Sequence, residues 1–374
     1  MSGIGIDKIK LKNFKCHKNF EMELKNLNVL AGSNAAGKSS LVQAILLAFK
    51  SWECCEKKQV NTNNVSGINM GIPISIVSED LEEKDIVIEL FADGIDNRVV
   101  LELPEDDEEI YFNIGNCEEI VESKTHGCNL DKMRLFFLNA ERQGPRIVSV
   151  IQDVIPYSVG NSGENTGYIL SEMDKFQKLS EKFKLSKDLK IAAIDRFSAN
   201  CEEWLDFIIP HTKLQYNVDI EKNITTLMMQ NQGEFHLPVA TGFGITYVLP
   251  IVVQALAASV IKNSVLVIEN PEAHLHPLSQ SRLGKFLALV AANGVQVILE
   301  THSEHIVDGC RIQAAREKTC SDMKVLFFEK KENTSLCKCI GILDNGELER
   351  WPEGFFDQKR LDLRELLEIR RCGN

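Results

Sequence analysis

One short stretch of this 374-residue chain constrains its fold more than any other. An apolar run at residues 27–30 leads into a loop of the form G-x-x-x-x-G-K-S, from Gly32 to Ser39, and an apolar helical pattern follows. Glycines let the backbone curl so that successive N–H groups point inward at phosphate oxygens. The order strand, loop, helix therefore predicts a phosphate-binding loop in an α/β fold.

Each part of this loop has an expected contact with a nucleotide. The helix that opens at Lys38 turns its positive end toward the phosphates, and Lys38 adds a full charge near the β- and γ-phosphates. The hydroxyl of Ser39 suits Mg²⁺, so the predicted cofactors are ATP and Mg²⁺. The predicted nucleotide-binding residues of the loop are Gly32, Ser33, Asn34, Ala35, Ala36, Gly37, Lys38, Ser39 and Ser40.

The composition excludes several classes of protein. Hydrophobic residues make up 44% of the chain and charged residues 26%, which is ordinary for a folded protein. The longest mostly apolar run, residues 248–261, is shorter than the roughly 20 residues that cross a bilayer, so it predicts a buried helix. The start of the chain lacks the features of a secretion signal, and the 11 scattered cysteines predict reduced thiols. We therefore expect a cytoplasmic protein without membrane contact.

The charge balance argues against a general nucleic-acid coat, since the net charge is −12. The net charge does not exclude a local basic surface that contacts nucleic acid. Lys8, Lys10 and Lys12 alternate and so share one face of a strand, which is either solvated or in contact with DNA. Lysines between residues 175 and 190 are interspersed with acids and predict a solvated helical surface.

Two further strands end in candidate catalytic groups. The apolar run at residues 265–268 ends in Glu269, which we expect to hold Mg²⁺. A later run at residues 295–299 ends in Glu300, and His302 follows two residues on, where it could sense the γ-phosphate. A helical pattern at residues 277–292 separates these two strands, and residues 135–138 and 323–328 predict two more.

The order of these motifs resembles that of ATP-binding-cassette-type ATPases, and within them the SMC, RecF and OLD (overcoming lysogenisation defect) group. The resemblance rests on the phosphate loop, on P-E-x-H-L-H-P at residues 271–277, on T-H-S at residues 301–303 and on the opening strand at residues 9–15. The ending W-P-E-G-F-F-D-Q, residues 351–358, resembles a narrower family of small bacterial AAA-family ATPases. The resemblance to these ATPases implies an α/β P-loop NTPase core of ATP-binding-cassette type with two inserted lobes.

The predicted division of the chain follows from the motifs and from the segments between them. Residues 1–50 and 236–345, with a strand near residues 133–146, should form the ATPase core. Residues 51–132 should form a β-rich lobe, with runs at residues 74–77 and 86–90, and residues 147–235 a mainly helical lobe. Residues 346–374 remain as a C-terminal segment.

The resemblance also implies a head-to-tail homodimer that encloses ATP. The glycine-rich segment at residues 241–246 of one subunit, with Gly242 and Gly244, would close over the nucleotide of the other. Gln143 occupies the place of a family glutamine that contacts Mg²⁺ and water, with Glu141 as the alternative. Arg142 either contacts phosphate or pairs with an acid. His274 and His276 should fix the loop after Glu269 and meet the neighbouring subunit.

The sequence departs from the family at the catalytic position. Asn270 stands where the family has the glutamate that activates water, and an amide cannot accept a proton near neutral pH. Glu272 and Glu300 are the candidate replacements. With one of them as the base the chain is a slow ATPase, and without one it is a switch held by ATP.

Three functions remain open. Residues 39–265 show no sustained heptads, which argues against a chromosome-scale tether, and no D-x-D motif follows residue 322, which argues against an OLD-type nuclease. The first reading is a sensor or regulator of a separate effector encoded nearby, in bacterial anti-phage defence. The second is a RecF-like DNA-repair ATPase that clamps DNA. The third is a non-hydrolysing scaffold in which ATP is structural.

Overall fold

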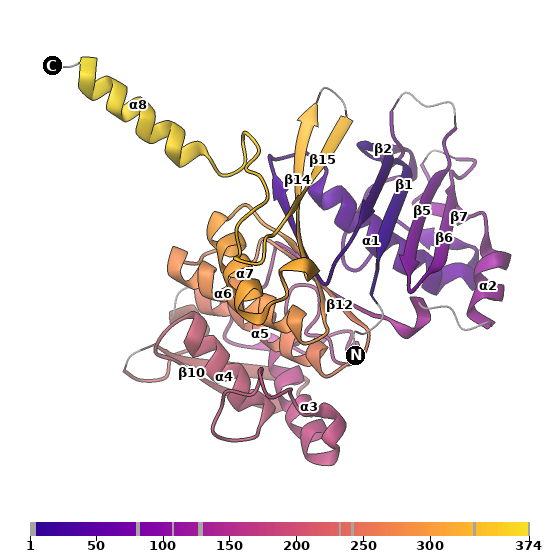
Figure 1. Ribbon diagram of the computed structural model, residues 1–374. Coiled ribbons are helices and arrows are strands. Elements are labelled where there is room, and N and C mark those ends of the chain that lie inside the picture. Colours follow the sequence, from indigo (N-terminus) through magenta and orange to yellow (C-terminus); the bar gives the residue numbers. More distant parts are fainter. Residues whose placement is uncertain are drawn as a thin grey trace.

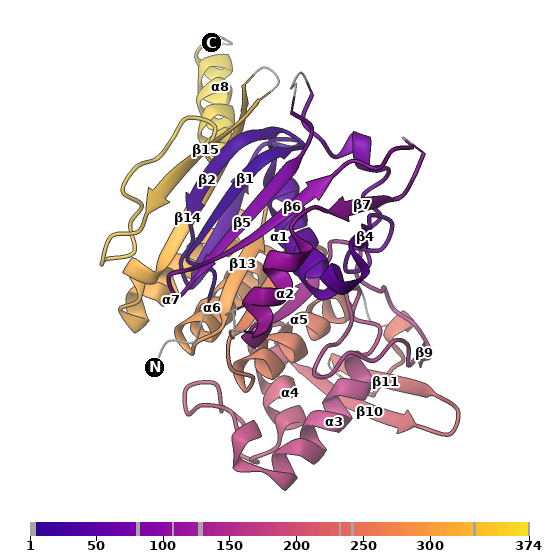
Figure 2. The same cartoon turned by 90° about the vertical axis from the view of Figure 1, so that its right-hand side faces the viewer.

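A computed structural model describes residues 5–79, 83–106, 108–125, 130–231, 233–240, 243–331 and 334–372 of the chain. In this part of the chain the strands form two six-stranded sheets and a three-stranded sheet. The two larger sheets lie on either side of helix α1 (Lys38–Cys54), and the small sheet lies with α3 and α4 at one end of the molecule (Figures 1 and 2).

The central sheet carries the predicted motifs. Its order is β15-β14-β3-β13-β12-β8, in which β15 alone runs antiparallel to its neighbour. Four of its strands are short apolar runs that are buried over most of their length, which is typical of a sheet covered on both faces. The strands predicted from the sequence are therefore confirmed: β3 (Leu27–Gly32), β8 (Arg134–Leu138), β12 (Ser264–Glu269), β13 (Gln296–Glu300) and β14 (Met323–Lys331), with β15 (Thr334–Gly341) at the edge.

The second sheet crosses the boundary predicted near residue 50. Strands β1 (Lys8–Phe14) and β2 (His17–Glu23) pair with strands from residues 86–114, so residues 51–132 do not form a sheet of their own. Ile9 and Leu11 of β1 are buried in the cluster that includes α1, which explains the shared layer. The remaining elements of this layer are β4 (Gln59–Asn61), β5 (Ile86–Ala92), β6 (Ile95–Glu102), β7 (Tyr111–Ile114) and α2 (Cys117–Thr125).

Two local predictions were wrong. Residues 74–77 are not a strand; Pro73–Ser75 form a 3₁₀ turn, because Pro73 has no N–H and its fixed φ suits the start of a helix. Residues 147–235 are not mainly helical. They combine α3 (Thr166–Leu179) and α4 (Phe197–Ile208) with the sheet β10 (Thr212–Asp219), β11 (Ile224–Asn231) and β9 (Ser149–Val150). Apolar residues alternate along β10, a signal of period two that the sequence does carry.

The other face of the central sheet is covered by α5 (Phe243–Ser259), α6 (Pro277–Ala292) and α7 (Glu304–Glu317). The helices predicted at residues 248–261 and 277–292 are confirmed as α5 and α6. The final helix, α8 (Gln358–Cys372), projects from the body in Figure 1. Among the described residues, none of the helices is both long and apolar enough to cross a bilayer.

Candidate functional site

The phosphate loop joins β3 to α1 in a conformation that depends on its glycines. Gly32 has φ +135°, and a Cβ atom there would lie 2.0 Å from the carbonyl oxygen of Phe328 on β14. Ala35 and Gly37 also have positive φ, of 56° and 102°. These turns leave the loop curled around the side chain of Lys38, as the G-x-x-x-x-G-K-S pattern predicts.

Lys38 lies at the centre of the loop. Its side chain is buried, and Nζ donates to the carbonyl oxygens of Gly32 (3.0 Å) and Ser33 (2.8 Å). Burial lowers the pKa of Lys38, while the nearby charges of Glu300 and Glu272 act in the opposite direction. The ammonium group thus donates to neutral carbonyl oxygens and lies near two acids. A phosphate carries more negative charge than these carbonyls, so it would be the stronger partner for the ammonium group.

Two residues that the sequence did not point to support the loop from outside. The ring of His17 on β2 lies with Nε2 3.0 Å from the carbonyl oxygen of Gly37. The hydroxyl of Ser335 on β15 donates to the carbonyl oxygen of Ala36. His17 comes from the strand before β3 and Ser335 from the edge of the sheet 299 residues away, and neither belongs to the loop pattern itself.

The predicted acids Glu269 and Glu300 lie side by side. They end the neighbouring parallel strands β12 and β13 and are paired in register. Burial, with the charge of Glu300 second, raises the pKa of Glu269 to about 7. Burial also raises the pKa of Glu300. Two carboxylates held this close repel each other, so a cation bound between or beside them would be favourable.

The hydroxyl of Ser39 completes this group. Its Oγ donates to Oε1 of Glu300 at 2.8 Å, and Oε2 of Glu269 accepts from the backbone N–H of Ala140 at 3.2 Å. Oε2 of Glu300 is buried and has no hydrogen-bond partner within the described residues. A buried carboxylate oxygen without a partner is costly, so these residues fit Mg²⁺, whose preferred ligands are hydroxyl and carboxylate oxygens.

Glu272 and His302 form a second contact beside the acid pair. Oε2 of Glu272 accepts from the Thr301 hydroxyl, and Oε1 accepts from the backbone N–H of His302, both at 2.7 Å. Partial desolvation, with the charge of Lys38 second, lowers the pKa of His302. Both oxygens of Glu272 are therefore engaged in placing the residues that follow β13, whereas Glu300 keeps one oxygen without a partner.

Asn270 and Arg142 fix the loop after β12. Asn270 has φ +44°, and its backbone N–H donates to the carbonyl oxygen of Glu300 at 2.8 Å. Arg142 is buried and donates to the backbone carbonyls of Asn139, Glu269 and Asn270. Within the described residues Arg142 forms no ion pair, although the charges of Glu272 and Glu269 act on it, and the phosphate contact stays a prediction. Desolvation lowers its pKa to about 10, so the guanidinium remains charged.

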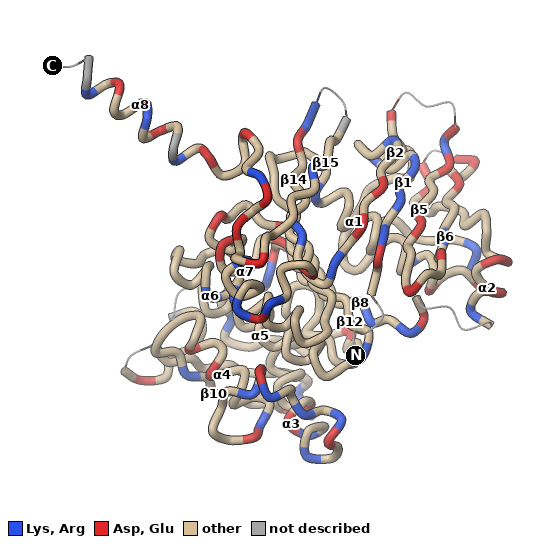
Figure 3. Tube along the Cα trace, viewed as in Figure 1, with Lys and Arg blue, Asp and Glu red and all other residues tan. Residues whose placement is uncertain are grey.

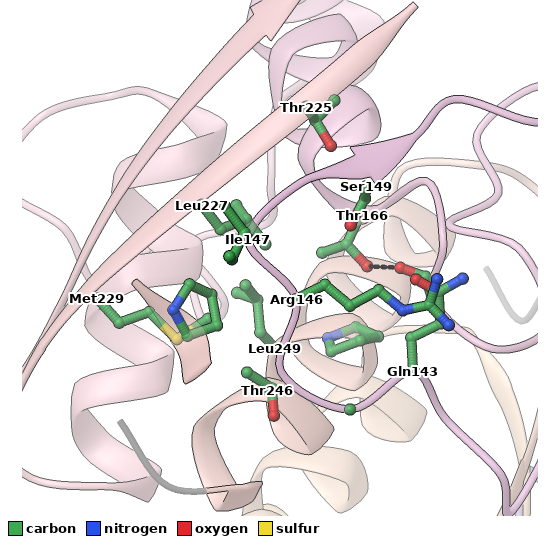
Figure 4. A pocket seen from close by; sticks show the side chains of 14 residues that line it. Gln143, Arg146, Ile147, Ser149, Thr166, Thr225, Leu227, Met229, Thr246 and Leu249 are labelled. Carbon is green, nitrogen blue, oxygen red and sulfur yellow. Dashed lines mark hydrogen bonds between the residues drawn. The ribbon is translucent and has the colours of Figure 1, made fainter. Parts of the chain in front are cut away.

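Gln143 lies on another side of the same segment. Its backbone N–H donates to the carbonyl oxygen of Ser162 at 2.8 Å, and its side chain lines a cavity against α5 and β11 (Figure 4). Glu141 is exposed. Within the described residues no hydrogen bond links Gln143 to Ser39 or to the acid pair, so contact with the metal remains a prediction.

The glycine-rich segment is described only in part. Thr241 and Gly242 lie outside the described residues, whereas Gly244 is in the first turn of α5. A Cβ atom on Gly244 would lie 3.0 Å from the carbonyl oxygen of His274, and the His274 ring meets Tyr247 edge to face. The side chain of His276 accepts from the N–H of Leu278 at the start of α6. The start of α5 thus packs on the loop that follows β12.

The lysines of β1 share one face, as predicted, and that face also carries acids. Lys8 and Lys10 form ion pairs with Glu21, and Lys12 with Glu83. Figure 3 shows blue and red segments interspersed over β1, β2 and β5. This pairing favours a solvated sheet face over a nucleic-acid surface.

The site and fold can now be compared with known proteins. A family model described as "AAA domain, putative AbiEii toxin, Type IV TA system" matches residues 27–308. The chain belongs to this family. A second model, described as "Protein of unknown function (DUF3696)", matches residues 319–366, which include β14, β15 and the start of α8.

Two characterised relatives match shorter parts of this AAA-domain chain. The DNA double-strand break repair Rad50 ATPase of Archaeoglobus fulgidus is 32% identical over 78 residues, 20% of this chain and 9% of the relative. The DNA replication and repair protein RecF of Acetivibrio thermocellus is 30% identical over 80 residues, 21% of this chain and 22% of the relative. The chain thus spans less than a quarter of the length of either relative.

Solved structures support the same fold. An Smc head bound to the C-winged helix domain of ScpA has a TM-score of 0.50 at 11% identity, covering 90% of this chain and 98% of that chain. An Smc head from Pyrococcus furiosus, bound to the C-terminal domain of ScpA, has a TM-score of 0.53 at 12% identity, covering 98% and 100%. With the family match, they confirm the predicted α/β P-loop fold of ATP-binding-cassette type, which is similar to that of Smc heads.

Proposed function

We propose that this AAA-domain protein binds ATP with Mg²⁺, hydrolyses it slowly, pairs head to tail around the nucleotide and regulates a separate effector protein. The observation that carries the proposal is the cluster of Lys38, Ser39, Glu269 and Glu300 around one loop. It provides a buried cation for the phosphates, the Ser39 hydroxyl and the Glu269 carboxylate for the metal, and on Glu300 a buried oxygen without a hydrogen-bond partner among the described residues. The magnesium ion would neutralise charge on the phosphates and on the acid pair.

The residues divide the remaining work. Ser39 and Glu269 would hold the metal, with Gln143 as a further predicted ligand. Glu300 has both the free oxygen and the raised pKa that suit a group accepting a proton from water. Glu272 would position His302 at the γ-phosphate through its contact with the His302 backbone. The amide at Asn270 supports slow turnover, because the family's usual base is missing there.

The resemblance to the family and the exposed apolar side chains of α8 support dimerisation and control of an effector. Gly244 lies at the start of α5, within the segment expected to close over a partner's nucleotide, as in the ATPases that the chain resembles. The uncovered α8 has five apolar side chains between 45% and 61% exposed, a feature typical of partner contacts. The family description, a putative toxin of a type IV toxin–antitoxin system, supports work alongside another protein. Anti-phage defence is part of our proposal for that pair.

Nucleotide binding is the first test. Isothermal titration with ATP and Mg²⁺ should give saturable binding to the full chain, at least 100-fold weaker in Lys38→Ala because the charge at the loop centre is lost. Lys50→Ala, in the last turns of the same helix, is the matched control and should bind as the native chain does. Equal affinity in the native chain and Lys38→Ala would falsify the proposed site.

The dimer and the effector need a second test. Glu300→Gln should trap ATP, so light scattering should show a dimer with ATP and a monomer with ADP. Co-expression with the protein encoded next door should give an association that requires ATP. A monomer under all nucleotide conditions contradicts the dimer, and co-purification independent of nucleotide contradicts regulation.

A second function, clamping of DNA, is favoured by the matches to Rad50 and RecF. It predicts binding of duplex DNA that requires ATP and weakens steeply with salt. The paired lysines of β1 count against that strand face as the contact. A third outcome, tightly retained ATP with no phosphate release at all, would identify the scaffold reading instead.

A further inference from the structure

The hairpin of β14 and β15 contacts the phosphate loop at both ends. At the start of the loop, the carbonyl oxygen of Phe328 on β14 leaves no room for a Cβ atom on Gly32. At its end, the hydroxyl of Ser335 on β15 donates to the carbonyl oxygen of Ala36. The hairpin lies within residues 319–366, which the family model of unknown function matches, and the match to the AAA domain ends before it. A segment outside the AAA match therefore supports the AAA domain's phosphate loop.

Strand β2, which lies beside β15 in Figures 1 and 2, contacts the next carbonyl of the loop. Nε2 of His17 lies 3.0 Å from the carbonyl oxygen of Gly37. A carbonyl oxygen only accepts, so Nε2 carries a proton and donates. Nδ1 is buried without a hydrogen-bond partner among the described residues, and burial lowers the pKa of His17. The imidazole is therefore a neutral donor, and the rings of Phe20 and Phe328, with centroids 4.7 and 6.2 Å away, hold its orientation.

These two contacts decide where two N–H groups of the loop point. In a trans peptide group the N–H bond points away from the C=O bond. The carbonyl of Ala36 shares its peptide group with the N–H of Gly37, and the carbonyl of Gly37 shares one with the N–H of Lys38. Ser335 and His17 hold both carbonyls on the outside of the loop. Both N–H groups are thereby directed to the opposite side, where phosphate oxygens would lie.

The two side chains also pack directly against this part of the loop. A Cβ atom on Gly37 would lie 2.7 Å from Oγ of Ser335 and 2.9 Å from Cε1 of His17. The same C-terminal segment reaches the start of the loop as well, because residues 353–358 line one cleft together with Gly32 and Ser33. The contacts of the segment with the loop are thus not limited to one hydrogen bond.

We propose that Ser335 and His17 are positioning residues that keep the phosphate loop in its nucleotide-binding conformation, so that residues 319–366 form part of the nucleotide site. This inference rests on the proposed binding of ATP. Each side chain acts through a carbonyl of the loop and not through the nucleotide itself. The loop would hold the phosphates in the ground state and in the transition state alike, so loss of either contact should weaken ATP binding more than turnover.

The test compares variants of the whole chain by isothermal titration with ATP and Mg²⁺ and by steady-state phosphate release. Ser335→Ala should raise the Kd and KM for ATP about fivefold and His17→Phe about tenfold, with kcat within about twofold of the native value. Ser335→Thr and His17→Gln keep a donor and should bind ATP nearly as the native chain does. Ser321→Ala, which removes an exposed hydroxyl from the same segment, is the matched control and should change neither constant.

Melting temperatures measured without nucleotide show which variants fold. If His17→Phe fails to fold, Ser335→Ala decides by itself, because Ser335 is half-buried on an edge strand. The proposal is overturned if the native chain binds ATP and Ser335→Ala binds it equally tightly, or if Ser335→Thr is as weak as Ser335→Ala. A native chain that binds no ATP at all contradicts the proposed function itself, and this positioning role with it.

Discussion

Half-buried Glu269 and buried Glu300 end adjacent parallel strands, and the hydroxyl of Ser39 reaches only Glu300 of the two. The carboxylate of Glu269 instead accepts the Ala140 N–H. Glu269 and Glu300 therefore have different hydrogen-bond partners, and separate substitutions of the two acids can test this difference.

The pH dependence of stability should reveal the acid pair. The pKa of Glu269 rises from 4.5 to about 7, so the folded chain keeps a proton that the unfolded chain has already lost. This contribution is present below about pH 4.5 and is lost as pH rises through 7. Glu269→Gln mimics the neutral acid, so its melting temperature should match that of the native chain at about pH 4 and exceed it at pH 8.

The control for this experiment is Glu105→Gln, an exposed acid, which should track the native chain at both pH values. Adding ATP with Mg²⁺ should reduce the advantage of Glu269→Gln at pH 8, because a cation offsets the repulsion between the acids. A constant difference between Glu269→Gln and the native chain across pH would show that Glu269 titrates normally.

Glu300 and Glu272 should differ in their effect on turnover. Glu300→Gln removes the carboxylate that meets Ser39, so phosphate release should fall at least 100-fold while ATP binding remains within about fivefold. Glu272→Gln replaces one acceptor oxygen with an amide, and one of the contacts to Thr301 and His302 is lost. Its turnover should fall about tenfold.

The companion variant is Thr301→Val, which removes the hydroxyl that Glu272 accepts from. It should resemble Glu272→Gln if Glu272 acts by positioning. A greater loss of turnover in Glu272→Gln than in Glu300→Gln would instead make Glu272 the base.

The close contact of the phosphate loop with β14 predicts that replacing Gly32 by alanine costs much more stability than replacing Gly94. In Gly32→Ala the new Cβ would meet the Phe328 carbonyl oxygen at 2.0 Å, so the free energy of unfolding should fall by more than about 3 kcal/mol. Gly94 also has a positive φ, of 77°, but nothing lies within 4 Å of its Cβ position. Gly94→Ala should therefore cost only about 1 kcal/mol of backbone strain in urea unfolding.

Arg142 should matter for stability and for the metal site. Arg142→Met leaves the buried carbonyls of Glu269 and Asn270 without donors, at a cost of about 3 kcal/mol in urea unfolding. Because Glu269 ends β12 and Asn270 follows it, Mg²⁺-dependent ATP binding should also weaken. Arg316→Met on α7 is the exposed control, and a loss of stability equal to that control would contradict the positioning role.

Much of the central sheet could be predicted because each strand is a continuous apolar run of fixed length. Such runs are typical of a sheet covered on both faces. The predicted ends of β12 and β13 lie within one residue of the observed ends. The pairing of β1 with β5 could not be predicted. Strand partners are chosen by packing across the whole chain, and β1 pairs with a strand more than 70 residues away.

The site divides in the same way. The sequence by itself determined the phosphate loop and its lysine, since glycines and a helix start act through neighbouring backbone atoms. It also named Glu269, Glu272, Glu300 and His302 as candidates, without ranking them. The tertiary structure alone decided that Glu300 meets Ser39, a residue 261 positions away, and that Glu272 is already occupied. Burial and the charges of neighbouring groups set these roles, and both depend on residues that only the folded chain brings together.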